Sequence, residues 1–199
     1  MNSAMNNKVL SDFFGATEGS MRLAKQTALV VLGIAVLAVA AKIKVPMWPV
    51  PITMGTFAVL SIGAAYGARL GLFTIFGYML IGALGFDVFA GSSAEVFGLE
   101  YMQGGTAGYL VGYVLATILL GVLARMGWDR SAPKMAVAML LGNAFIYIPG
   151  LIWLGMFYGW DKPILAWGLT PFLVGDMVKL ALAAALFPAI WKFVGRARD

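Results

Sequence analysis

Six apolar segments alternate with polar or irregular stretches along the chain. They cover residues 24–43, 53–66, 70–86, 106–124, 135–157 and 171–193. A transmembrane helix needs about 20 mostly apolar residues, so the second and third segments are short and should be tilted or partly covered. The pattern predicts an all-α integral membrane protein: a six-transmembrane-helix bundle over residues 24–196. The mixed segment 1–23 before it is interpreted as cytoplasmic, either a frayed tail or a short surface helix.

The segment KVPMWPVPITM, residues 44–54, interrupts this helical pattern. Pro46, Pro49 and Pro51 exclude a regular helix here. Extended backbone at membrane depth is tolerated only where it is buried in protein or lines a cavity. Two roles for Trp48 remain open, an anchor at the membrane interface and a wall of a binding pocket.

The loop over residues 87–105 is long for a connection between helices. It carries Asp87, Glu95 and Glu100 and contains no basic residue. Long loops are often lids or binding loops. The apolar residues Phe89, Phe97 and Tyr101 predict that this loop packs onto the bundle.

Composition agrees with a membrane protein. Of 199 residues, 61% are hydrophobic and 12% are charged, whereas a soluble domain has about 25% charged residues. The chain has no cysteine and no histidine, which excludes thiol chemistry and the commonest metal ligand. It also has no GxxxxGK[ST] phosphate loop. We therefore expect no metal, no cofactor and no catalytic residue.

The basic residues lie mostly at segment ends, so the net charge of +5 does not indicate nucleic acid. With the N-terminus inside, inner regions hold ten basic residues and outer loops hold three, Lys42, Lys44 and Lys162. This bias predicts cytoplasmic termini in a multi-pass cell-membrane protein, located in the inner membrane of a bacterium. No cleavable signal peptide is expected.

The sixth segment begins with TPFLVGDMVK, residues 170–179. Thr170 is a candidate helix cap and Pro171 suits a first helical turn. Asp176 and Lys179, three residues apart, share one helix face. Charges near the bilayer centre are costly, so such residues usually face an interior cavity. Both would lie in the outer half of the membrane, near the proline-rich segment and the acidic loop.

Three classes of function remain at this point. A substrate-binding transport subunit would use the pair to hold a small polar ligand. An intramembrane enzyme would use Asp176 and Lys179 as acid and base, but it would lack histidine, cysteine and a metal cluster. A structural protein leaves the polar pair without a purpose, unless the two charges only neutralise each other.

Several segments resemble one family in order and spacing over residues 24–190. They read VPMWPVPITM, YMLIGALGFDVFAG, GGTAGYLVGY, NAFIYIPGLIWLG and GLTPFLVGDMVKLALA. The chain is similar to the BioY family, the biotin-binding S components of energy-coupling-factor (ECF) transporters. This resemblance implies a six-helix bundle that takes up biotin with a T component and ATP-binding subunits. Biotin would bind near the outer face, under the loops between helices one and two and helices three and four.

Asp176 and Lys179 match the GD..K pair of that family and are the implied polar part of the biotin site. Asp176 would accept a hydrogen bond from a ureido N–H group, and Lys179 would donate to a ligand oxygen. The chain departs from the family pattern at Gly105 and Ala107 and has no arginine in its third loop, which leaves the partner of the biotin carboxylate open. Further pocket candidates are Trp48, Phe89, Tyr109, Asn143, Tyr147 and Phe172.

Overall fold

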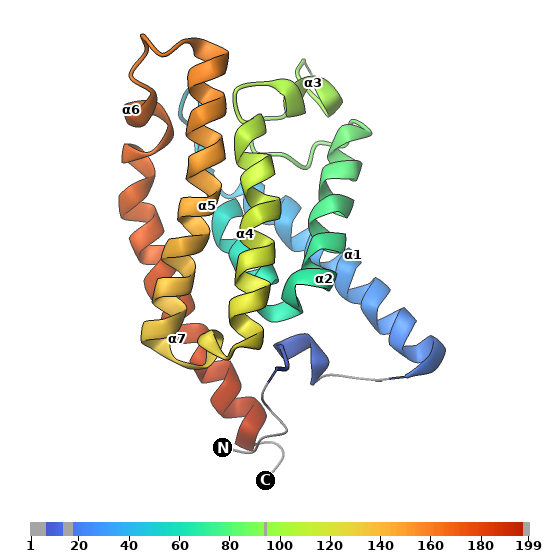
Figure 1. Ribbon diagram of the computed structural model, residues 1–199. Helices are drawn as coiled ribbons and strands as arrows, with labels where there is room; N and C mark the ends of the chain where they lie inside the picture. The colour runs from blue at the N-terminus through green and yellow to red at the C-terminus, as the bar shows by residue number, and fades with distance from the viewer. Residues whose placement is uncertain (1–6, 14–17, 94, 197–199) are drawn as a thin grey trace.

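The computed structural model describes residues 7–13, 18–93 and 95–196. Its long helices form a bundle (Figure 1). They are α1 (Gly19–Lys42), α2 (Gly55–Ala83), α4 (Ala107–Arg125), α5 (Ala132–Tyr158) and α7 (Leu173–Arg196). Short elements connect them: η2 (Leu10–Asp12), β1 (Lys44–Val45), β2 (Ile52–Thr53), α3 (Gly98–Gln103), η3 (Trp128–Arg130), α6 (Ile164–Gly168) and η4 (Thr170–Phe172).

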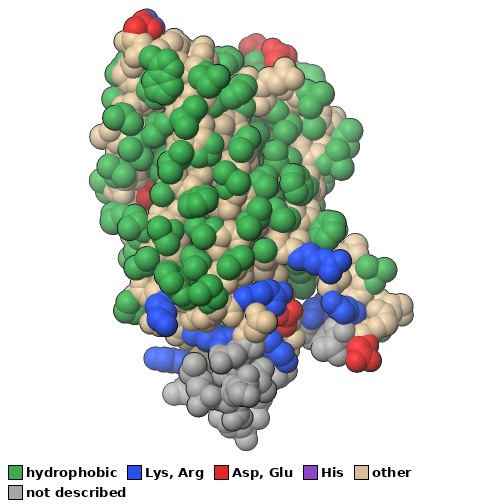
Figure 2. Space-filling model, viewed as in Figure 1, with side chains coloured by type: hydrophobic (Ala, Val, Ile, Leu, Met, Phe, Trp, Pro, Cys, Tyr) green, Lys and Arg blue, Asp and Glu red, His purple; other side chains and the backbone are tan. Residues whose placement is uncertain are grey.

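Within the described residues, five helical stretches are long and apolar enough to cross a membrane. Four are α1, α2, α4 and α5, and the fifth is the stretch Ile164–Gly195 around α7. Figure 2 shows apolar side chains over most of the visible flank and Lys and Arg side chains gathered at one end. The predicted class, a mostly helical membrane protein, is therefore confirmed.

Helix α2 consists of two arms, residues 55–66 and 68–83, that correspond to the predicted second and third segments. They meet at Gly67, whose φ of 75° lies in the left-handed region that favours glycine. Figure 1 shows the chain reversing there, so the second arm runs back along the bundle. A Cβ atom at Gly63 or Gly71 would crowd Thr117 of α4. The close helix contact at these glycines therefore depends on their missing side chains.

The proline-rich segment forms a hairpin. Strands β1 and β2 pair antiparallel, with Lys44 opposite Thr53 and Val45 opposite Ile52. The prolines lie in the connection between the strands, where no helix is possible. The prediction of a non-helical segment is correct. The predicted all-α fold did not include this two-stranded hairpin.

Residues 7–13 of the N-terminal segment pack against the bundle. Val9 and Leu10 are buried, and Leu10 opens the single 3₁₀ turn η2. Arg125 and Arg130 donate hydrogen bonds to the backbone carbonyls of Asn7 and Lys8. The turn is thereby fastened to the end of the bundle where α4 ends and α5 begins. Residues 1–6 and 14–17 of the predicted segment lie outside the described residues.

Three details of the helices differ from the predicted pattern. Helix α1 begins at Gly19, ahead of residue 24, and the short helix α3 interrupts the loop 87–105. Thr170 does not cap a helix: no side-chain cap hydrogen bond is present at η4, and the Thr170 hydroxyl donates to the Leu165 carbonyl at 3.1 Å. Thr170 and Pro171 form the 3₁₀ turn η4, and α7 begins at Leu173.

Candidate ligand-binding site

The candidate site is built on the first turns of α7. Asp176 Oδ1 and Lys179 Nζ are 3.1 Å apart. The two residues are only 2% and 6% exposed. The spacing of three residues places both side chains on one face, as predicted. The pair lies inside the protein rather than on its lipid-facing surface, as expected for charges within a membrane.

Two other helices also form hydrogen bonds with the pair. Tyr147 on α5 donates its hydroxyl proton to Asp176 Oδ2. Lys179 Nζ also donates to Thr56 Oγ1, in the first turn of α2, at 2.9 Å. Losing one partner of a buried ion pair typically costs about 3–5 kcal/mol, whereas two apolar residues are often equally stable. The pair is therefore a poor device for stability alone.

A cavity lies next to this pair. The β1–β2 hairpin, the 87–106 region, α2, α4, α5 and η4 all contribute to its lining. Its volume is about 60 Å³, which holds only a few water molecules. Five tyrosines line it: Tyr78, Tyr101, Tyr109, Tyr113 and Tyr147. With Lys179 and Thr56 they give an aromatic chamber that contains a small number of polar groups.

The cavity has a roof formed by the chain after α2. Phe89 is buried, stacks on Tyr101 with ring centroids 4.9 Å apart, and packs edge-on against Tyr78. Gly82 makes room for this ring, because a Cβ atom there would lie 2.1 Å from it. The prediction that the loop packs onto the bundle is correct for Phe89 and Tyr101, whereas Phe97 is half exposed.

Two lysines hold this roof in place. Lys42 Nζ lies 2.5 Å from Asp87 Oδ1 and donates to the Phe89 carbonyl at 2.8 Å. Lys44 Nζ donates to the Ala90 carbonyl at 2.5 Å. Hydrogen bonds from Lys42 and from the Ser92 hydroxyl keep the pKa of the Asp87 carboxyl below its usual range. The roof is thus attached by charged side chains to the end of α1 and the start of the hairpin.

The structure brings most of the predicted site residues together. Lys179, Phe89, Tyr109, Tyr147 and Phe172 line the cavity. Asp176 lies directly behind this lining, in contact with Tyr147 and Lys179.

Two predicted residues lie elsewhere. Trp48 is 67% exposed and packs against Tyr158 and Trp167, outside the cavity lining. Asn143 is buried on α5, one turn before Tyr147, and does not line the cavity. Its Oδ1 has no hydrogen-bond partner among the described residues.

Thr56, Tyr78, Tyr101 and Tyr113 are cavity residues that were not predicted as site residues. A signal existed for two of them. Thr56 is a polar residue at the start of an apolar segment, and Tyr113 follows Tyr109 by one helical turn. Tyr78 and Tyr101 come from an apolar segment and a loop, and only the folded chain brings them to the cavity.

The arrangement suits a small molecule with a polar head and an apolar body. Asp176 is an acceptor, Lys179 and the hydroxyl groups are donors, and the aromatic rings form apolar walls. The fold and the site define a multi-pass membrane protein with an aromatic cavity and a buried ion pair beside it.

Comparison with known proteins identifies the family. The BioY family matches residues 5–196, and the chain belongs to this family. A "Probable biotin transporter BioY" of Pyrococcus horikoshii is 36% identical over 163 residues, which cover 82% of this chain and 94% of the relative. The "Biotin transporter BioY" of Thermotoga maritima is 31% identical over 160 residues, 80% of this chain and 88% of the relative.

The fold is also similar to that of a solved structure. The crystal structure of the S-component for biotin from an ECF-type ABC transporter has a TM-score of 0.70 to this chain. The match covers 88% of this chain and 95% of the other, at 19% sequence identity. At that identity the similarity shows a shared fold.

Proposed function

We propose that this protein binds biotin in the cavity beside Asp176 and Lys179 and takes it up across the cell membrane as the S component of an ECF-type ABC transporter. One observation carries the proposal: in a chain of the BioY family, a buried and hydrogen-bonded ion pair adjoins an aromatic cavity. Membership of the family favours this function over an intramembrane enzyme with Asp176 and Lys179 as acid and base.

The chemistry of biotin fits the groups present. Asp176 accepts a hydrogen bond from a ureido N–H, and Lys179 donates to a ligand oxygen. Tyr109, Tyr147 and Phe172 surround the thioether ring. Because the free space is about 60 Å³, biotin enters when the roof that carries Phe89 and Tyr101 moves aside. Asp176, Asn143 and Trp48 lie outside this cavity lining, so contact between biotin and any of these residues requires a rearrangement.

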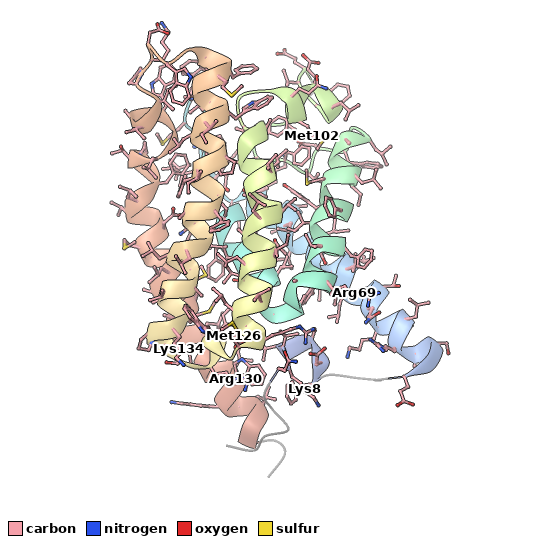
Figure 3. All side chains as sticks on the ribbon, viewed as in Figure 1. Lys8, Arg69, Met102, Met126, Arg130 and Lys134 are labelled. Atoms are coloured by element: carbon pink, nitrogen blue, oxygen red, sulfur yellow. The ribbon has the colours of Figure 1, made fainter. Side chains whose placement is uncertain are left out.

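The bundle is proposed to cross the membrane six times, with each arm of α2 counted as one segment. The end of the bundle that carries Lys8, Arg69, Arg130 and Lys134 (Figure 3) faces the cytoplasm. The cavity then opens toward the outside. The distribution of basic residues supports this orientation. Residues 1–23 form the cytoplasmic segment and residues 24–196 the membrane domain.

Uptake against a gradient needs energy from partner proteins, because the sequence has no phosphate loop. The partners are a T component and ATP-binding subunits. Ala24 and Ala28 lie one turn apart on α1 and are exposed, which allows close approach of a helix of the T component. Concentrative uptake in vesicles that lack every ATPase partner would contradict this requirement.

Calorimetric titration of the purified protein with biotin tests the central claim. We expect saturable binding of biotin and no binding of riboflavin, a vitamin of different shape. Cooperative thermal unfolding of the same sample shows that the protein is folded. A folded sample that does not bind biotin would overturn the proposed function.

A further inference from the structure

A second hollow lies at the opposite end of the bundle from the biotin cavity. It has a volume of about 760 Å³ and lies between η2, the first half of α1, the start of the second arm of α2, and the end of α4. Its lining includes five basic residues: Lys8, Arg22, Lys25, Arg69 and Arg125. Figure 2 shows basic side chains gathered at this end, and Figure 3 labels Lys8 and Arg69.

The positive charge of this basic hollow is poorly compensated. Asp12 is the single acidic residue among its described lining residues, and it lies 3.5 Å from Arg125. Within the described part of the chain, Arg22, Lys25 and Arg69 form no ion pair. The bias toward cytoplasmic bases explains their presence at this end. It does not explain why five of them surround one hollow, while Lys134 and Lys192 at the same end do not line it.

An apolar groove adjoins the basic hollow. Its volume is about 560 Å³, and it lies between α1, the first arm of α2 and α7. Aliphatic and aromatic side chains dominate its lining, including Leu32, Val36, Phe57, Ile62, Leu186 and Ile190. Tyr66 borders both spaces, and Leu10 in the groove precedes Ser11 in the hollow. The basic hollow is therefore continuous with the apolar groove.

These two spaces match the two parts of one molecule. An anionic phospholipid has a phosphate group at the membrane surface and acyl chains in the hydrocarbon core. Basic pockets between transmembrane helices on the cytoplasmic side are a recurrent way to bind such headgroups. We propose that this protein binds an anionic phospholipid, with the phosphate in the basic hollow and an acyl chain in the apolar groove.

Such a lipid would stabilise the position of α1. This helix has an exposed apolar surface that includes Val31, Leu32, Val36 and Val39. A lipid in the groove fills the space between α1 and α7 and bridges α1 to the turn at Gly67 through the headgroup. The lipid therefore contributes to the position of α1 in the bundle.

The charge half of the proposal is tested on the purified full-length protein with phosphatidylglycerol and, as the neutral probe, phosphatidylcholine. Native mass spectrometry counts bound lipid, and thermal unfolding reports stabilisation. The test variant is Arg22→Gln with Arg69→Gln. The matched control is Lys134→Gln with Lys192→Gln, which removes the same charge at the same end but outside the hollow. Figure 3 shows Lys134 on the other side of this end from Arg69.

We expect the wild type and the control to prefer phosphatidylglycerol, and the test variant to bind it roughly thirtyfold more weakly. One base near a membrane surface is worth about a factor of five in binding, and two are removed. Equal binding by test and control variants, whether both retained or both lost, would overturn the proposal. The proposal would also be overturned if the test variant still bound the lipid but lost a protein subunit that co-purifies with the wild type. The hollow would then be a protein interface.

A second pair of variants tests the groove. Ala35→Trp fills the groove at a residue that lines it, and Ala28→Trp adds the same side chain on the exposed surface of α1. We expect several-fold weaker phosphatidylglycerol binding in Ala35→Trp and unchanged binding in Ala28→Trp. Glycerol phosphate, which has the headgroup phosphate without acyl chains, should not stabilise the wild type at the same concentration. Equal stabilisation by glycerol phosphate would show a phosphate site and contradict the lipid site.

The lipid proposal and the biotin proposal fail separately. None of the substituted residues lines the biotin cavity, so all variants should bind biotin as the wild type does. A wild type that binds phosphatidylglycerol but not biotin would refute the proposed function and leave the lipid site standing.

Discussion

The hydroxyl of Tyr147 on α5 donates a hydrogen bond to the buried Oδ2 of Asp176 on α7. The other carboxylate oxygen faces Lys179 at 3.1 Å. Each oxygen of the carboxylate thus has a different partner, and one partner comes from another helix. This contact connects two long helices at the level of the candidate site.

Replacing Tyr147 with Phe removes this donor and leaves the ring in place. A hydrogen bond to a charged group contributes about 1.5–3 kcal/mol, so we expect the ligand-free protein to lose roughly that amount of stability. The matched control is Tyr113→Phe, since no hydrogen bond from the Tyr113 hydroxyl to a described residue is present. Thermal unfolding in detergent measures both. An unchanged melting temperature in Tyr147→Phe would show that the bond contributes nothing.

Asp176→Asn should weaken biotin binding roughly ten- to hundredfold or more while the protein stays folded and inserted. The reason is the loss of a charge-assisted hydrogen bond worth about 1.5–3 kcal/mol, at about 1.4 kcal/mol per tenfold. Biotin titration and thermal unfolding are measured on the single variant and on Asp176→Asn with Lys179→Met. If the pair only balances its own charges, the double variant regains stability and wild-type affinity, which would end its role as the binding site.

Lys44 is a candidate partner for the biotin carboxylate, because its ammonium group lies 2.5 Å from the carbonyl of the cavity residue Ala90. We expect Lys44→Met to weaken biotin binding about tenfold, as for one lost charge-assisted hydrogen bond. Binding of biotin amide, whose tail is neutral, should not change. The control is Lys162→Met, another outer lysine, paired with Asp161 at 2.9 Å. An equal loss for biotin and its amide would exclude this role.

Asp129 should make stability depend on pH. It is 1% exposed, and Trp191 Nε1 donates to its Oδ2 at 2.6 Å. Burial raises the pKa of Asp129 from 3.8 to about 6, although the Trp191 hydrogen bond and the Arg130 charge act against this shift. The folded state therefore binds this proton more tightly than the unfolded state. The charged form costs stability above about pH 6, and the cost is relieved as the pH falls toward about 4.

The test of this prediction is Asp129→Asn, which keeps an acceptor for Trp191 and removes the charge. The melting temperature of the variant relative to wild type should be highest near pH 7.5 and should decline as the pH falls to 5. Taking the difference removes the contribution of other carboxyls, such as Asp87, whose pKa is lowered. A difference that is constant over this range would refute the assignment.

Topology is tested with reporter fusions at Ser131 and Ser92. The proposed orientation places Ser131 inside and Ser92 outside, because the chain holds ten bases on one side against three on the other. An enzyme reporter that is active only in the cytoplasm should report at Ser131 and be silent at Ser92. A silent reporter at Ser131, or an active reporter at Ser92, would contradict the orientation.

Much of the helical framework could be predicted from the sequence because long apolar runs have one stable form in a membrane. The site pair could also be predicted, since two charges three residues apart in an apolar helix stand out. Thr170 was misjudged because its hydroxyl has a competing acceptor, the Leu165 carbonyl in the preceding turn. The packing of Val9 and Leu10 was missed because local polarity in residues 1–23 conceals a contact with distant helices.

Sequence reasoning predicted that the loop 87–105 packs onto the bundle and that Phe89 is a pocket residue, but it did not identify the residues that hold the roof. Phe89 is placed by Tyr78 and the space that Gly82 leaves, both on α2, and by Tyr101 on α3. Trp48 lies outside the cavity for a similar reason. Its aromatic partners Tyr158 and Trp167 come from the far end of α5 and from α6. Neither contact follows from the periodicity of one segment.

The attachment of the roof by Lys42 and Lys44 has a mechanical consequence. Lys42 is the last residue of α1, and it binds both the side chain of Asp87 and the carbonyl of Phe89. The roof of the cavity is therefore bonded to α1, whereas the ion pair of Asp176 and Lys179 belongs to α7. If α1 tilts relative to α7, either the roof moves with α1 or these bonds break. Among the described spans α1 is the least buried, so a tilt of this helix that keeps the bonds changes the distance between the roof and the ion pair.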